Sequence, residues 1–148
     1  MAGKKLFVVA AGSGGHILPA LTHAKKWLTQ HPDDEIIFFT GTSNLEHKII
    51  KNKSFIAQTK HLTLSKFSLR RWWVLPLILV QLTGMFFRGL FYTLWHRPAT
   101  VVSTGGLLAI PFCVAARIAG CHVEVYELNV VPGKAVKLLL PIATVVYT

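Results

Sequence analysis

Three glycines and a histidine lie within five consecutive positions near the start of the chain, in the run Gly12-Ser13-Gly14-Gly15-His16. The run follows an apolar stretch, Leu6–Ala11, and precedes a helical pattern. A loop that leaves a parallel strand and enters a helix presents backbone N–H groups and the positive end of the helix dipole to an anion. Glycine lets a phosphate approach the backbone closely. We therefore predict a diphosphate site formed by Gly12, Ser13, Gly14 and Gly15.

His16 closes this run, at the mouth of the predicted loop. A histidine beside a bound phosphate can act as a general base or can stabilise negative charge. We predict that His16 is the catalytic residue. The alternative is a histidine that only caps or packs.

The loop departs from the common nucleotide-binding patterns. The dinucleotide fingerprint needs a glycine at position 17, where this chain has Ile17, and an acidic residue after the second strand, where it has Phe39-Thr40-Gly41. A P-loop would need Gly-Lys-Ser/Thr after the glycines, and Cys113 and Cys121 lie in no cluster with zinc spacing. We predict no cofactor and no metal, and two small thiols in a reducing compartment.

Two further segments follow strand-like runs. Ser103-Thr104-Gly105-Gly106 forms a second glycine turn, and Glu127 and Asn129 follow a third apolar run. The carboxyl ends of parallel strands meet at one edge of a sheet, where such folds bind ligands. We predict substrate contacts from Thr104, Gly105, Gly106, Glu127 and Asn129. For Glu127, a solvated loop acid is the alternative.

Apolar runs alternate with helical patterns along the whole chain. Strands are predicted at Leu6–Ala10, Glu35–Thr40, Ser54–Thr63, Ala99–Ser103, His122–Tyr126 and Ala143–Tyr147. Helices are predicted at Leu18–Gln30, from a Ser43/Glu46 capping box to Asn52, at about 68–95, at Leu108–Ala119 and at Gly133–Leu140. This order predicts an α/β fold with a doubly wound, Rossmann-like parallel sheet in a single domain, residues 1–148.

The charge is strongly positive, with 16 Lys and Arg against 6 Asp and Glu. No acidic residue lies between Glu46 and Glu124, and Trp72 to Phe87 carries no charge over sixteen positions. Basic residues around an aromatic, apolar body favour an anionic membrane surface over nucleic acid. We predict a membrane-associating segment at about 68–97, lying in the interface. A buried helix and a short transmembrane or re-entrant segment are the alternatives.

The apolar stretch near the start of the chain resembles the core of a secretory signal but is shorter. Its six residues, Leu6–Ala11, are fewer than the ~7–15 that such a signal needs. This difference favours a location in the cytoplasm.

These motifs resemble those of the MurG family of glycosyltransferases (GT-B fold, family 28). Gly12 to Ala20 is similar to the family's first glycine loop, Ser103 to Pro111 to its second, and Tyr126-Glu127-Leu128-Asn129 to its His-Glu-Gln-Asn segment. Tyr126 and Leu128 replace the histidine and glutamine of that segment. MurG-like enzymes transfer N-acetylglucosamine from UDP-GlcNAc to a polyprenyl-diphosphate-linked sugar, converting lipid I to lipid II in peptidoglycan synthesis.

The resemblance implies that this chain is the acceptor-binding half of such a transferase. It further implies peripheral attachment to the cytoplasmic face of the inner (plasma) membrane. The donor-binding domain is expected to be absent from these 148 residues, and the chain to be inactive without a donor-binding domain or subunit. The alternative is a non-catalytic, membrane-anchoring subunit of a split glycosyltransferase, since split enzymes occur in this superfamily. A nucleotide-binding regulatory domain is a third, weaker interpretation.

Overall fold

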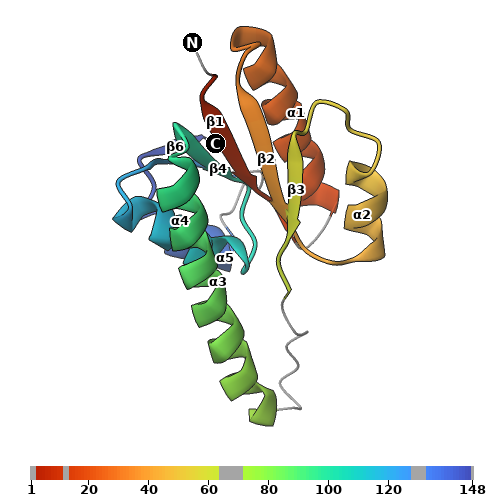
Figure 1. Ribbon diagram of the computed structural model, residues 1–148. Coiled ribbons are helices and arrows are strands. Elements are labelled where there is room, and N and C mark those ends of the chain that lie inside the picture. The colour runs from red at the N-terminus through yellow and green to blue at the C-terminus, as the bar shows by residue number, and fades with distance from the viewer. Residues whose placement is uncertain (1–2, 12–13, 64–71, 128–132, 148) are drawn as a thin grey trace.

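The computed structural model describes residues 3–11, 14–63, 72–127 and 133–147, in which strands and helices alternate (Figure 1). The strands are β1 (Lys5–Val9), β2 (Glu35–Thr40), β3 (Gln58–His61), β4 (Thr100–Ser103), β5 (His122–Tyr126) and β6 (Val145–Tyr147). The helices are α1 (Gly14–Gln30), α2 (Asn44–Ile50), the 3₁₀ turn η1 (Trp72–Val74), α3 (Leu75–His96), α4 (Ala109–Ile118) and α5 (Lys134–Leu139).

All six strands pair in parallel, in the order β3-β2-β1-β4-β5-β6. The order reverses between β1 and β4, as in doubly wound sheets, so the predicted α/β, Rossmann-like fold is confirmed. Parallel strands need crossover helices, which cover both faces of the sheet.

Alternate residues of each strand point into two separate cores. Leu6 and Val8 of β1 pack with Ile17 and Ala20 of α1, on the face that α1 and α2 cover. Phe7 points the other way, toward α3, α4 and α5. Its ring lies 5.0 Å from that of Phe39 and 6.2 Å from that of Phe112, centre to centre. The continuous apolar runs of the strands follow from burial on both faces.

Two predicted elements begin four residues away from their predicted start, and β6 begins at Val145 instead of Ala143. α1 begins at Gly14, not Leu18, because the first turn of the helix is built from the glycine run itself. Pro19 therefore lies in the second turn, where its missing N–H removes only a bond to the first turn. β3 covers Gln58–His61 and not the predicted 54–63, because this edge strand pairs with β2 over four positions only.

The predicted capping box of α2 is confirmed. The backbone N–H of Glu46 donates to Ser43 Oγ at 3.3 Å, and the backbone N–H of Ser43 donates to Glu46 Oε2 at 2.8 Å. A Cβ atom at Gly41 would lie 2.5 Å from that same carboxylate oxygen. A glycine at position 41 therefore leaves room for the cap that starts the helix after β2.

The long apolar segment forms η1 and α3. Pro76 lies at the start of α3 and does not kink it, and residues 68–71 of the predicted segment lie outside the described chain. The later part of α3 packs against α4, with Gly89 in contact with Phe112. The first part extends beyond the other described elements, on the side of the sheet where α1 begins (Figure 1).

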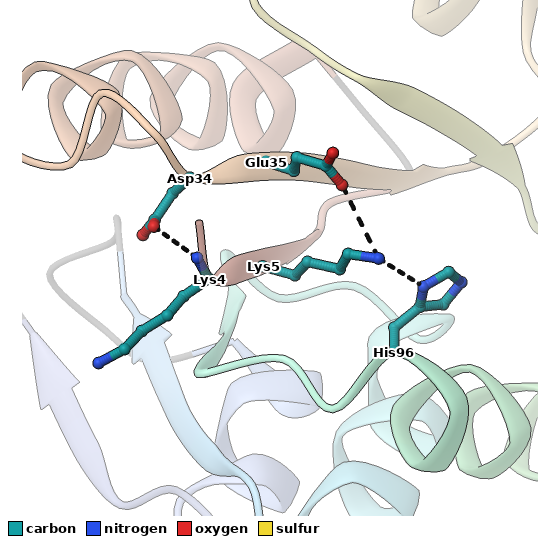
Figure 2. Close-up of polar contacts among 5 residues, drawn as sticks. All are labelled: Lys4, Lys5, Asp34, Glu35 and His96. Atoms are coloured by element: carbon teal, nitrogen blue, oxygen red, sulfur yellow. Dashed lines mark hydrogen bonds and ion pairs between the residues drawn. The ribbon is translucent and has the colours of Figure 1, made fainter. Parts of the chain in front are cut away.

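At the opposite, amino edge of the sheet, Lys5 ties β1 to β2 and to the end of α3 (Figure 2). The Lys5 ammonium lies 3.8 Å from Glu35 Oε2 and donates to His96 Nδ1 at 3.1 Å. An ammonium group can only donate, so His96 Nδ1 must be unprotonated to accept. Burial, and then the charges of Lys5 and Lys60, lower the pKa of His96, while Glu35 acts in the other direction.

This arrangement predicts a pH-dependent contribution of His96 to stability. Its folded-state pKa lies below the ordinary value of 6.5, so the folded state binds fewer protons than the unfolded state. The free energy of unfolding therefore falls as the pH drops from about 6.5 through the lowered pKa. Urea denaturation at several pH values should show a smaller fall for His96→Gln than for the wild type. His31→Gln, at an exposed position, is the control, and equal slopes for wild type and His96→Gln would contradict the prediction.

Two glycines with similar backbone angles differ in their surroundings. Gly106 has a φ of 99° and Gly120, which ends α4, a φ of 83°. A Cβ atom at Gly106 would lie 2.6 Å from the carbonyl oxygen of Ala11, whereas no atom of the described residues lies within 4 Å of one at Gly120. Only Gly106 therefore combines a left-handed backbone with close packing against the end of β1.

We predict that Gly120→Ala lowers the free energy of unfolding by about 1–2 kcal/mol, the cost of the left-handed backbone alone. Gly106→Ala should cost roughly 1–3 kcal/mol more, because its methyl group meets a backbone oxygen that cannot move aside easily. Chemical denaturation of the two variants side by side measures the difference. Equal losses would show that the approach of Gly106 to Ala11 does not limit the packing of the loops.

Candidate functional site

The carboxyl edge of the sheet brings the predicted segments together. β4 lies between β1 and β5, so the segments that follow these three strands emerge side by side. Val9 pairs with Ser103, and Ser103 with Val125, so the strands end at nearly the same level. The two glycine turns therefore lie at the same edge of the sheet, as predicted.

His16 and Thr104 join the two loops by a reciprocal pair of hydrogen bonds. His16 Nδ1 lies 2.7 Å from the carbonyl oxygen of Thr104, and Thr104 Oγ1 donates to the carbonyl oxygen of His16 at 2.8 Å. A carbonyl oxygen can only accept, so the proton of the neutral His16 ring is on Nδ1. Nε2 then carries the lone pair, which is the form that a general base requires.

The peptide unit between Thr104 and Gly105 is held at both ends. Its carbonyl oxygen accepts from His16, and its N–H donates to Ser103 Oγ at 3.1 Å. Gly105 has a φ of 98°, and a Cβ atom there would lie 3.1 Å from Val136 Cγ2 and 3.6 Å from His16 Cε1. Thr104 is 2% exposed, and its hydroxyl and carbonyl both contact His16.

Glu127 is buried, and its own chain holds it at two points. Its backbone N–H donates to the carbonyl oxygen of Tyr147 at 2.8 Å, and its Oε2 accepts from the N–H of Gly133, ahead of α5, at 3.2 Å. The carboxylate therefore bridges the segment that follows β5. It is not the solvated loop acid that the sequence left open as an alternative.

The structure describes some of the predicted site residues and not others. Gly14, Gly15 and His16 form the first turn of α1, and Thr104, Gly105 and Gly106 lie beside it. Gly12, Ser13 and Asn129 lie outside the described residues.

Sequence reasoning did not single out Ser103. Its hydroxyl also hydrogen-bonds the thiol of Cys113 on α4, whose pKa burial raises to about 12, so this thiol stays protonated. A serine two residues before a glycine, at the last position of a strand, is a known turn-forming position and could have flagged it.

α3 presents a second surface. Together, η1 and α3 expose ten large apolar side chains: Trp72, Trp73, Leu75, Leu77, Leu79, Val80, Phe87, Phe91, Leu94 and Trp95. By length and composition the helix Trp72–His96 could cross a membrane, and only 17% of its most apolar window is buried. It therefore differs from an ordinary core helix, which the sequence left open as an alternative.

Comparisons with known proteins agree with this architecture. Residues 6–148 match the glycosyltransferase family 28 N-terminal domain. The chain is 28% identical over 140 residues to the UDP-N-acetylglucosamine--N-acetylmuramyl-(pentapeptide) pyrophosphoryl-undecaprenol N-acetylglucosamine transferase of Carboxydothermus hydrogenoformans. It is 32% identical over 139 residues to the protein of that name from Desulfitobacterium hafniense. Each match covers 91% of this chain and 36% of the relative, so the chain spans just over a third of their length.

Solved structures show the same fold. The crystal structure of Acinetobacter baumannii MurG matches 97% of this chain and 40% of its own, with a TM-score of 0.80 and 24% identity. UDP-GlcNAc 2-epimerase from Methanocaldococcus jannaschii matches with a TM-score of 0.65 at 15% identity, over 97% of this chain and 39% of its own. The chain therefore belongs to glycosyltransferase family 28, whose N-terminal domain it carries.

Proposed function

We propose that this domain binds the acceptor of an N-acetylglucosaminyltransferase, a polyprenyl-diphosphate-linked sugar, and supplies the base that activates it. The names of the relatives support the acceptor class, since they specify a pyrophosphoryl-undecaprenol substrate. In this proposal the reaction is lipid I to lipid II, with UDP-GlcNAc as donor. It requires a donor-binding half, supplied by the same polypeptide or by a partner subunit.

The contact between the two glycine loops is the observation that carries the proposal. α1 has 17 residues, and its first turn lies at the carboxyl edge with Gly14 and Gly15. The first N–H groups of a helix have no carbonyl partner within it, and they favour a phosphate there. Gly15 is exposed, and Gly106 lies against Ala11 at the end of β1. The diphosphate would bind at this junction, with Gly12 and Ser13 completing the loop.

His16 is the proposed base. Its Nε2 takes the proton of the acceptor hydroxyl, whose oxygen attacks the anomeric carbon of the donor sugar. The bond from that carbon to UDP breaks, and UDP leaves with the bonding electrons, which inverts the anomeric centre. His16 later returns the proton to solvent or to product. Glu127 and Asn129 are proposed to bind the acceptor sugar, Glu127 from its bridged position beside α5.

The projecting part of α3 is proposed to hold the domain on the membrane. It extends on the same side of the sheet as the first turn of α1 (Figure 1), so a lipid-linked acceptor would present its diphosphate where His16 lies. The exposed side chain of Arg88, farther along α3, would favour an anionic surface. A peripheral location on the cytoplasmic face of the membrane is part of this proposal.

The exposure of α3 also favours a second candidate function, a membrane-anchoring subunit that recruits a catalytic partner. In that case the domain would bind membrane and partner, and His16 would be dispensable for transfer. The two functions differ in their response to a change at His16.

Binding and transfer test the proposal together. A short-chain polyprenyl-diphosphate-linked muramyl peptide should bind the chain more tightly than UDP-GlcNAc by calorimetry. In the assembled transferase, His16→Gln should lower kcat about 100- to 10,000-fold, because a general base is lost. Acceptor affinity should stay close to that of the wild type.

His31→Gln, at an exposed position on the far edge, is the matched control. Preferential binding of UDP-GlcNAc would refute the acceptor role. Full activity of the His16→Gln enzyme would refute the role of His16 as the base and would favour the membrane-anchoring function.

Membrane binding has its own test in vesicle co-sedimentation. Phosphatidylglycerol vesicles should bind the chain more strongly than phosphatidylcholine vesicles, and salt should reduce the difference. Replacing Trp72 and Trp73 by Ser should weaken binding roughly 10-fold or more, because two exposed aromatic side chains lose their apolar contact. Leu45→Ser, an exposed apolar position on α2, should have no effect, and equal loss from it would contradict the assignment to α3.

A further inference from the structure

We propose that Ser103 is a positioning residue that sets the tautomer of His16 by holding the Thr104–Gly105 peptide in one orientation. This inference rests on the proposed role of His16 as a base. The residue does not touch the acceptor site directly, since its side chain is fully buried beneath the second glycine loop.

The Thr104–Gly105 peptide unit hydrogen-bonds His16 at its carbonyl end and Ser103 at its N–H end. The carbonyl oxygen of Thr104 accepts from His16 Nδ1 at 2.7 Å, and the N–H of Gly105, in the same peptide plane, donates to Ser103 Oγ at 3.1 Å. Because the plane is rigid, the Ser103 hydroxyl on one end determines what the other end presents to His16.

The opposite orientation would reverse the chemistry of the ring. If this peptide flipped, its N–H would point toward His16 Nδ1, which would then have to accept. The proton of the neutral ring would move to Nε2, and the atom facing the acceptor would no longer hold a lone pair. Gly105, with its φ of 98°, lacks the Cβ that would oppose such a change.

Two further contacts keep Ser103 and the peptide in place. The Ser103 hydroxyl is hydrogen-bonded to the Cys113 thiol, which anchors it to α4. The Thr104 hydroxyl donates to the His16 carbonyl oxygen at 2.8 Å, which holds the loop against α1. Both predicted substrate contacts at the start of this loop, Thr104 and Gly105, thus act on His16.

Removing the hydroxyl should release the peptide. In Ser103→Ala the buried N–H of Gly105 loses its acceptor, and a buried N–H without a partner destabilises the fold. If the Thr104–Gly105 peptide flips, the N–H of Gly105 can donate to His16 Nδ1 instead. We therefore expect Ser103→Ala to shift His16 from the Nδ1–H to the Nε2–H tautomer.

Imidazole ¹⁵N NMR of the labelled chain at about pH 8, above the ordinary histidine range, reads the tautomer directly. The His16 signals are assigned by their loss in His16→Gln. The wild type should show a protonated Nδ1 and an unprotonated Nε2, and Ser103→Ala should move both nitrogen shifts toward the reverse pattern. Ser103→Thr, which keeps the hydroxyl, should restore the wild-type pattern. Thr100→Val, a buried change at the other end of β4, is the control for general disturbance of the strand.

In the assembled transferase, Ser103→Ala should lower kcat about 10- to 100-fold with an unchanged acceptor KM. An unchanged tautomer in folded Ser103→Ala would overturn the inference, as would a raised KM with an unchanged kcat. If the wild type transfers no sugar, the proposed function fails, but the NMR result still decides whether Ser103 sets the His16 tautomer.

Discussion

The parallel pairing of β1 with β4 is the contact on which the candidate site depends. It joins two strands that are more than ninety residues apart in the chain, with Val9 beside Ser103. Because both strands run in the same direction, their following loops leave the sheet at one edge and at one height. The pair of hydrogen bonds between His16 and Thr104, 88 residues apart, is possible only in this register. A shift by one residue would turn every side chain of β4 to the other face.

The glycines of the second loop follow from the same closeness. Gly106 passes so near the Ala11 carbonyl that a methyl group has no room, and Gly105 lies against both Val136 and His16. Two constraints therefore favour glycine in this loop: its left-handed backbone, and the close approach of Ala11, just after β1, and of Val136 on α5. What it presents to His16 is a backbone carbonyl, whose orientation a buried serine determines.

The length of α3 explains why an apolar projection lies beside this site. A crossover helix returns the chain past the sheet, and β4 has four residues, about 13 Å at 3.3 Å each. α3 has 22 residues, about 33 Å at 1.5 Å each. Its end is tied to the amino edge through His96 and Lys5, so the excess length must extend beyond the carboxyl edge. One helix thereby packs against α4 with its later part and leaves its first part exposed.

Much of this protein could be read from local pattern. The alternating apolar runs determined the strands and the doubly wound sheet, and Ser43 with Glu46 determined the start of α2, because period and capping act over a few residues. The boundaries of α1 and β3 were wrong, since they depend on whether a glycine run continues a helix and on how far β2 offers a partner. The sequence by itself determined the fold class, and it located the two glycine loops and His16 as the candidate site. Only the tertiary structure decided that Ser103 and Thr104 bear on His16, and that Glu127 bridges to Gly133. These contacts join segments that only strand pairing brings together, and no local periodicity encodes which end of a peptide faces a ring.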